Sequence, residues 1–163
     1  MNAKEAIRSA FNVSDMVLQS YIGDLSDAEL MSRPGKGCNH IAWQLGHLIS
    51  SEANLVNMLK DGSAVELPAG FVEAHDKTAI DNNEASQFQS KDEYLELYNK
   101  TRQNSLAVIG ELTEEQLSAE TPEHFREFCP TNGDLAILIA THPMMHAGQF
   151  VPVRRSLDKP VVI

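Results

Sequence analysis

Two histidines near the C-terminal end, His142 and His146, stand four residues apart in the segment THPMMHAGQF. In an α-helix this spacing places two side chains on one face, one turn apart, so that both imidazoles can reach one metal ion. Pro143 stands between them, and a proline inside a helix removes a backbone donor and kinks or ends the helix. Six histidines give such a pair by chance roughly one time in five, so the spacing alone is weak evidence.

The composition of the chain narrows the kinds of site that it can form. The 163 residues suit one domain covering residues 1–163, and 42% hydrophobic and 22% charged residues are typical of a soluble globular protein. A formal net charge of −10, with no basic cluster beyond Arg154 and Arg155, argues against nucleic acid as a partner. Two cysteines are too few for a Cys-rich zinc site, so histidines and carboxylates would have to hold any metal.

No apolar run approaches the roughly eighteen residues needed to cross a membrane. The first residues, MNAKEAIRSAF, carry charges where a signal peptide needs an apolar segment. We therefore expect a cytoplasmic protein that does not interact with membranes.

Four segments have helical periodicity, and none has a convincing strand pattern. They cover about 3–22, 39–60, 90–112 and 134–157. Asn39 is a suitable N-cap for the second helix, and Ser90 with Glu93 fits a capping box at the start of the third. Together they predict an all-α fold, a four-helix bundle. The connection 61–89 is too long for a tight turn and predicts a long crossover between parallel helices two and three.

His142 and His146 fall within the apolar stripe of the last predicted helix. Burying a ring nitrogen without a partner costs roughly 1–3 kcal/mol, and one metal ion between the rings would satisfy both. A hydrogen-bonded core histidine is the more common explanation of a single buried imidazole, and it remains open here.

The second predicted helix supplies a third candidate ligand, His47, at the border of its apolar stripe. It lies near the middle of its helix, as the other two histidines do in theirs, so the three can converge. His40 begins the same helix about 10 Å away along the axis, and we expect it to be a capping or surface residue.

Two stretches, NHIAWQLGHL and HPMMHAGQFVPVRRSLDKP, resemble the DinB-like superfamily of metal-binding four-helix bundles. The pattern is Gly-His in helix two, then His-x-x-x-His-x-Gly-Gln, an arginine and Lys-Pro, and the resemblance spans nearly the whole chain. It implies a divalent metal held by His47, His142 and His146. Characterised enzymes of the superfamily, the bacillithiol transferases and mycothiol-dependent maleylpyruvate isomerases, use a low-molecular-weight thiol. Many other members have no known activity.

Two prolines depart from an ideal helix at this site. Pro143 and Pro152 should free the carbonyls of Ile139 and Gly148. One interpretation is that the helix restarts at Pro143, with His142 as its cap, which would separate the two ligands. The resemblance favours the other, a kinked but continuous helix that presents both histidines.

Three imidazoles can bind zinc or nickel, or iron as a further possibility, and leave coordination positions open. A thiol or water bound there would lose its proton at neutral pH and become a nucleophile. Cys38 and Cys129 precede their helices, two turns or more from the histidines, so we expect ordinary loop or buried thiols.

Four other residues could contribute to the site. Glu52 falls in the apolar stripe of helix two, where it could pair with Arg154 or Arg155, orient a ligand histidine, or be exposed at a packing gap. Gln149, one turn beyond His146, could line a pocket. We expect Trp43 to point to the other side of helix two, and His75 to be a solvated loop residue rather than a fourth ligand.

The last helix also has an apolar side away from the histidines, formed by Ile137, Met144 and Val151. A helix that is apolar on two sides is central or covered by a partner, and this predicts a homodimer. Two functional classes remain open. One is a metal- and thiol-dependent enzyme, a transferase or isomerase acting on a small molecule, and the other is a non-catalytic metal-binding or stress-associated protein.

Overall fold

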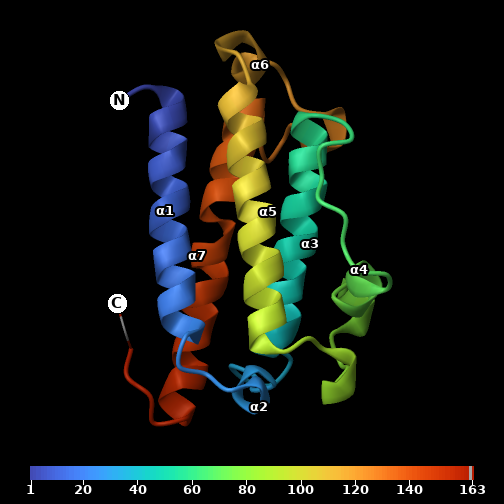
Figure 1. Cartoon of the computed structure of the whole chain (residues 1–163), viewed down its shortest axis with the longest axis vertical. Coiled ribbons are helices and arrows are strands. Elements are labelled where there is room, and N and C mark those ends of the chain that lie inside the picture. Colours follow the sequence, from blue (N-terminus) through green and yellow to red (C-terminus); the bar gives the residue numbers. More distant parts are fainter. Residues whose placement is uncertain (162) are drawn as a thin grey trace.

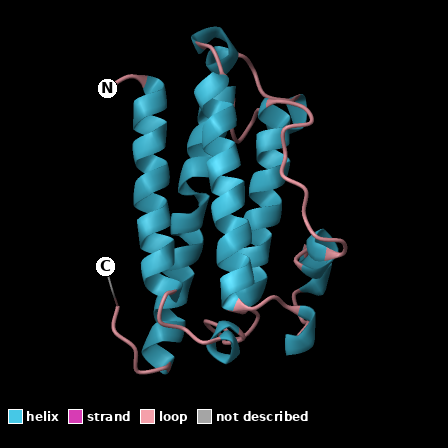
Figure 2. Ribbon diagram, viewed as in Figure 1, coloured by secondary structure: helices cyan, strands magenta, loops and turns pink. Residues whose placement is uncertain are grey.

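The computed structural model describes residues 1–161 and 163, and within them the fold is all-α. Figure 2 shows helices joined by loops, and the described chain forms no strand beyond an isolated bridge between Glu120 and Thr131. The α-helices are α1 (Ala3–Ile22), α2 (Asp27–Leu30), α3 (Ile41–Leu59), α4 (Phe71–Ala74), α5 (Lys91–Glu111), α6 (Glu114–Ser118) and α7 (Asn132–Ser156). Short 3₁₀ turns cover Lys77–Ala79, Ala85–Gln87 and Glu123–Phe125.

The four long helices α1, α3, α5 and α7 lie side by side, with α1 against α7, and α3 against both α5 and α7 (Figure 1). α3 and α5 run in one direction, and α1 and α7 run in the other. The segment between α3 and α5 returns along the outside of α3 and carries α4. Its course brings residues 71–78 close to α3.

Side-chain caps fix where these helices begin. Ser90 and Glu93 form the predicted capping box at the start of α5, and Thr131 forms another with Asp134 before α7. The prediction of Asn39 as the cap of α3 is wrong by one residue. The cap is His40, whose Nδ1 accepts a hydrogen bond from the backbone N–H of Trp43 at 3.0 Å.

The helix α7 is continuous through Pro143 and Pro152, so the interpretation that it restarts at Pro143 is wrong. The carbonyl of Ile139, which has no helical donor because Pro143 lacks an N–H, accepts a bond from Nη1 of Arg102 at 2.8 Å. A buried guanidinium thus replaces the missing backbone bond, and His142 stays within the helix.

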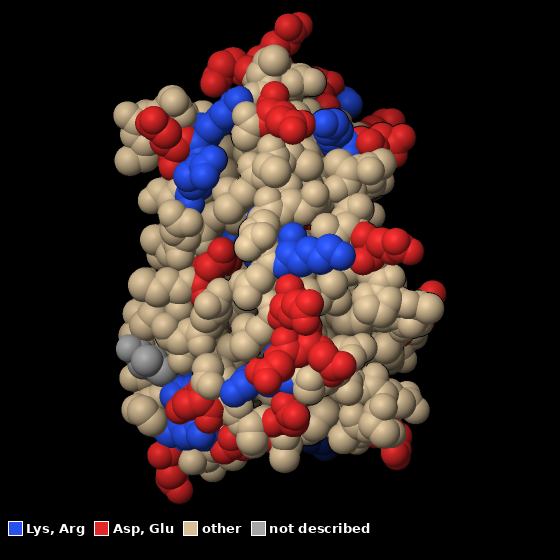
Figure 3. Space-filling model, in the orientation of Figure 1, with Lys and Arg blue, Asp and Glu red and all other residues tan. Residues whose placement is uncertain are grey.

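Apolar side chains from all four long helices fill the interior. They include Phe11 and Leu18 of α1, Leu45 of α3, Tyr98 of α5 and Phe150 of α7, all buried. On the face shown in Figure 3, acidic and basic side chains are intermixed. Within the described residues, no helix is both long enough and apolar enough to span a membrane.

Candidate metal centre

The three histidines expected to bind metal lie together between α3 and α7. One ligand atom from each of His47, His142 and His146 can be chosen so that all three lie within 4.8 Å of one another. The Nε2 atoms of His142 and His146 are 3.2 Å apart, as the four-residue spacing predicts. The centre of the His47 ring lies 5.7 Å from that of His142 and 5.4 Å from that of His146.

His146 is the most deeply placed of the three, with 6% of its surface exposed. Its Nδ1 lies 2.9 Å from Oε1 of Gln44 on α3. An amide oxygen can only accept, so Nδ1 carries the proton and Nε2 keeps its lone pair. That lone pair faces His142 and the interior of the cluster.

His47 is held by an aromatic neighbour on its own helix. The Trp43 ring stacks on it with centres 5.0 Å apart and an angle of 6° between the planes. The indole N–H of Trp43 donates to the carbonyl of Asp76 at 3.2 Å, so the crossover fixes Trp43 and, through it, His47. The prediction that Trp43 points to the other side of the helix is wrong, since residues four apart share a face.

Burial keeps all three imidazoles neutral at physiological pH. It lowers the pKa of His142 to about 4 and that of His146 to about 3. Burial also lowers the pKa of His47, and the nearby Lys77 charge lowers it further. Neutral imidazole is the form that binds metal, so the protonation states suit a metal site.

The donor set can be compared with the geometry of a bound ion. Zinc held tetrahedrally by imidazole nitrogens brings these nitrogens to about 3.3 Å from one another. The 3.2 Å between the Nε2 atoms of His142 and His146 already fits this geometry. The largest separation of the three ligand atoms, 4.8 Å, exceeds the ideal value by about 1.5 Å, a difference that a side-chain rotation can remove. Three neutral imidazole nitrogens, of which those of His47 and His142 belong to half-buried residues, fit zinc, nickel or iron.

Glu52 does not belong to this cluster. It is buried, and its Oε2 accepts from Nη1 of Arg102 at 2.9 Å, so the predictions of an arginine partner from α7, of a bond to a histidine and of an exposed position are wrong. Arg154 pairs instead with Asp24 at 2.6 Å. Sequence reasoning did not identify Arg102, because a single charged residue in a polar helix gives no local signal of burial.

Two further predictions also need correction. Gln149 is exposed, because at this point α7 turns Phe150 inward, so its predicted inward position is wrong. His75 is buried and not solvated, and both of its nitrogens are occupied: Nδ1 lies 2.7 Å from the Phe71 carbonyl and Nε2 lies 2.7 Å from the Tyr94 hydroxyl. The ring of His75 occupies the space beside Gly46, where a Cβ would come within 2.0 Å of it.

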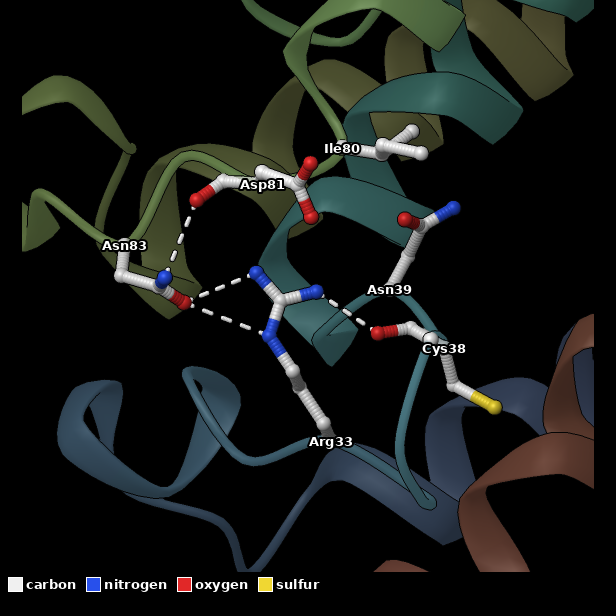
Figure 4. Close-up of a pocket in the computed structure, with 7 residues that line it drawn as sticks. Arg33, Cys38, Asn39, Ile80, Asp81 and Asn83 are labelled. Atoms are coloured by element: carbon white, nitrogen blue, oxygen red, sulfur yellow. Dashed lines mark hydrogen bonds between the residues drawn. The ribbon is translucent and has the colours of Figure 1, made fainter.

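The remaining predictions for this region agree with the structure. His40 caps α3, although it is buried and does not lie on the surface. Cys38 is an exposed loop thiol and Cys129 is buried, and neither belongs to the histidine cluster. A cavity of about 130 Å³ beside Cys38 is lined by Arg33 and loop residues and contains none of the three histidines (Figure 4).

Sequence reasoning missed two neighbours that hold the cluster, Trp43 and Gln44. The signal was available for Trp43, which precedes His47 by one helical turn. Gln44 faces α7, and only the packing of the two helices reveals that it meets His146.

The family model of the DinB superfamily matches residues 10–150. The chain belongs to the DinB superfamily. The match includes all three histidines of the cluster. A search of curated proteins found no significant sequence match to the chain.

Proposed function

We propose that His47, His142 and His146 bind one divalent metal ion, zinc or nickel in the first place and iron as a further possibility. The observation that supports this proposal is the convergence of three neutral imidazoles from two helices, with ligand atoms within 4.8 Å. In a four-helix bundle with a long crossover, the second and fourth long helices pack together and would bring these three imidazoles to one position. Membership of the DinB superfamily, whose members often bind metal, adds to it.

We further propose that the protein is a metal-dependent enzyme that uses a low-molecular-weight thiol to modify or isomerise a small molecule. A metal with three protein ligands lowers the pKa of a thiol or water bound at an open position. The chain itself would orient the ligands through Trp43 and Gln44 and keep the imidazoles unprotonated by burial. Neither cysteine of the chain reaches the cluster, so the thiol has to come from a small molecule.

A second candidate is a metal-binding protein without turnover. One observation favours it: in the part of the chain that the structure describes, no carboxylate is hydrogen-bonded to any of the three histidines. The buried carboxylate of Glu52 is bound to Arg102. An enzyme of this type would have to rely on the metal and substrate for proton transfer.

We also propose a cytoplasmic homodimer. Its interface would use the exposed side of α7, where Ile137 and Met144 are 51% and 41% exposed and Val151 is half-buried. Light scattering at micromolar concentration tests this proposal, and a monodisperse monomer would contradict it.

The experiment that separates the two functional candidates is a turnover assay of metal-loaded protein. Small electrophiles and maleylpyruvate are each supplied with bacillithiol, mycothiol or glutathione, and His142→Ala serves as the control. Product formation with one thiol that is lost in the variant supports the enzyme. Metal binding without turnover of any pair supports the non-catalytic protein.

A further inference from the structure

Gln44 connects the metal cluster to the loop in front of α3. It is buried, with 1% of its surface exposed, and it lies one turn before His47. Its Oε1 lies 2.9 Å from Nδ1 of His146, and its Nε2 donates to the carbonyl of Asn39 at 2.9 Å. Both ends of the amide are therefore used.

The bond to Asn39 decides which way the amide of Gln44 faces. A backbone carbonyl can only accept, so the NH₂ group must point to Asn39 and the oxygen to His146. If the amide turned over, its NH₂ would face Nδ1 and its oxygen would face a carbonyl oxygen. The NH₂ could still donate to Nδ1 if the ring changed its tautomer, but the contact between the two oxygens in a buried place would remain unfavourable, and this contact holds the observed orientation.

The loop itself is held by Arg33, which lies at the cavity in Figure 4. The Nη1 of Arg33 donates to the carbonyl of Cys38 at 2.6 Å, and its Nε and Nη2 both bind Oδ1 of Asn83 in the crossover. Asn39 follows Cys38 directly, so the carbonyl that orients Gln44 is part of a fixed backbone. A continuous series of hydrogen-bonded residues thus runs from Arg33 to His146.

We propose that Gln44 is a positioning residue that sets the tautomer of His146, so that Nε2 faces the metal position. The proposal rests on the proposed metal binding by the three histidines. Nδ1–H donation to an oxygen is how proteins fix a metal-binding histidine, and here a neutral amide takes this role in place of a carboxylate. Loss of such a partner typically weakens metal binding 10- to 100-fold.

The test uses Gln44→Met, which keeps the length of the side chain and removes the acceptor. The readout on metal-free protein is the ring ¹⁵N spectrum of His146, which distinguishes an Nδ1–H from an Nε2–H imidazole. Wild type should show the Nδ1–H form, and Gln44→Met should lose it and bind zinc 10- to 100-fold more weakly. Gln19→Met, the same change at an exposed position on α1, should alter neither.

Gln44→Glu keeps an acceptor for Nδ1–H but loses the donor to the Asn39 carbonyl, so it separates the two hydrogen bonds of the amide. It should keep the Nδ1–H tautomer and bind zinc more tightly than Gln44→Met. An unchanged tautomer in Gln44→Met would overturn the proposal, as would an altered tautomer with unchanged zinc affinity. The tautomer is measured without metal, so if wild type bound no zinc, the proposed function would fail while the effect of Gln44 on the ring would still be decided.

Discussion

The interior contains two clusters of buried polar groups. In the first, called the closed cluster, every N–H of an arginine has an acceptor; in the second, called the open cluster, several histidine nitrogens have no fixed partner. Arg102 lies at the centre of the first, 2% exposed, and all five of its N–H donors are used. Their acceptors are Asp15, Glu52, the hydroxyl of Ser14 and the carbonyls of Ile139 and Ala140. The guanidinium therefore joins all four long helices, and Oε1 of Glu52 is left without a hydrogen-bond partner among the described residues.

The histidine cluster is the open one. His146 has a partner for Nδ1, and its Nε2 lies 3.2 Å from the Nε2 of His142, so these two nitrogens can bond to one another only when His142 carries its proton on Nε2. His47 has a contact only with Ser51 at 3.4 Å among the hydrogen bonds of the described residues. Since buried polar groups in proteins are normally satisfied, the fully paired guanidinium of Arg102 points to a structural role, and the histidine nitrogens without a fixed partner point to a bound species.

The largest loss of stability should follow from removing the guanidinium of the closed cluster. Arg102→Met leaves Glu52 and the carbonyl of Ile139 without their arginine donor, while Asp15 keeps Tyr98 and the carbonyl of Ala140 keeps Ser14, and we expect a loss of about 3–5 kcal/mol in the free energy of unfolding. Lys100→Met changes an exposed residue of the same helix and should stay within about 0.5 kcal/mol of wild type. Urea unfolding of both variants measures this, and a mild effect of Arg102→Met would show that the cluster is not what joins the helices.

The next largest change in stability should follow from zinc binding to the histidines of the open cluster. Zinc binds only the folded protein at this site, so a concentration 100 times its dissociation constant should stabilise the fold by about 2.7 kcal/mol. His142→Ala should remove this gain. Thermal unfolding with and without zinc measures it, and equal stabilisation of both proteins would place the zinc elsewhere.

Acid should weaken the metal-free fold because several buried histidines are neutral only when folded. Burial lowers the pKa of His40 and His142 to about 4 and that of His146 to about 3, whereas unfolded histidine titrates near 6.5. The unfolded chain therefore binds more protons below pH 6.5, and stability falls as the pH falls towards 4. Each such proton contributes about 1.4 kcal/mol per pH unit.

Denaturant unfolding at pH 7 and pH 5, in the presence of a chelator, measures this loss. His142→Ala should lose less between the two pH values, because one of the titrating groups is gone. An equal or greater stability of wild type at pH 5 would argue against neutral buried histidines.

The smallest effect should come from Cys38→Ser. Cys38 is exposed and lies outside the histidine cluster, so metal content should not change and stability should stay within about 0.5 kcal/mol. Metal analysis and unfolding of the variant check both. Loss of metal would mean that a thiol of the chain takes part in binding.

The elements that the sequence predicted well are those with local causes. The 3.5-residue periodicity and the capping box at Ser90 predict α5, and the four-residue spacing predicts that His142 and His146 share a face. The position of His47 at the border of the apolar stripe of the second predicted helix made it the third candidate, and the resemblance to the DinB superfamily supported it. These features depend on a few neighbouring residues, so one sequence is enough to read them.

What the sequence did not reveal depends on contacts between distant segments. Arg102 looks like an ordinary surface residue of a polar helix until Asp15, Glu52 and the carbonyl that Pro143 leaves free surround it. His75 resembles a loop histidine until Gly46 makes room for its ring. The helical positions of His142 and His146 predict that Gln149 faces inward, but the neighbouring Phe150 is buried there and Gln149 is exposed.

If the histidine cluster binds a metal ion, the purified protein should contain that metal, so its metal content is the first quantity to measure. Tag-free protein purified without chelator is analysed by inductively coupled plasma mass spectrometry, beside His142→Ala. We expect about one equivalent of zinc, nickel or iron in wild type and none in the variant. Wild-type protein that contains no metal and takes up none on titration would contradict this expectation, and the three histidines would then be core residues that bond to one another.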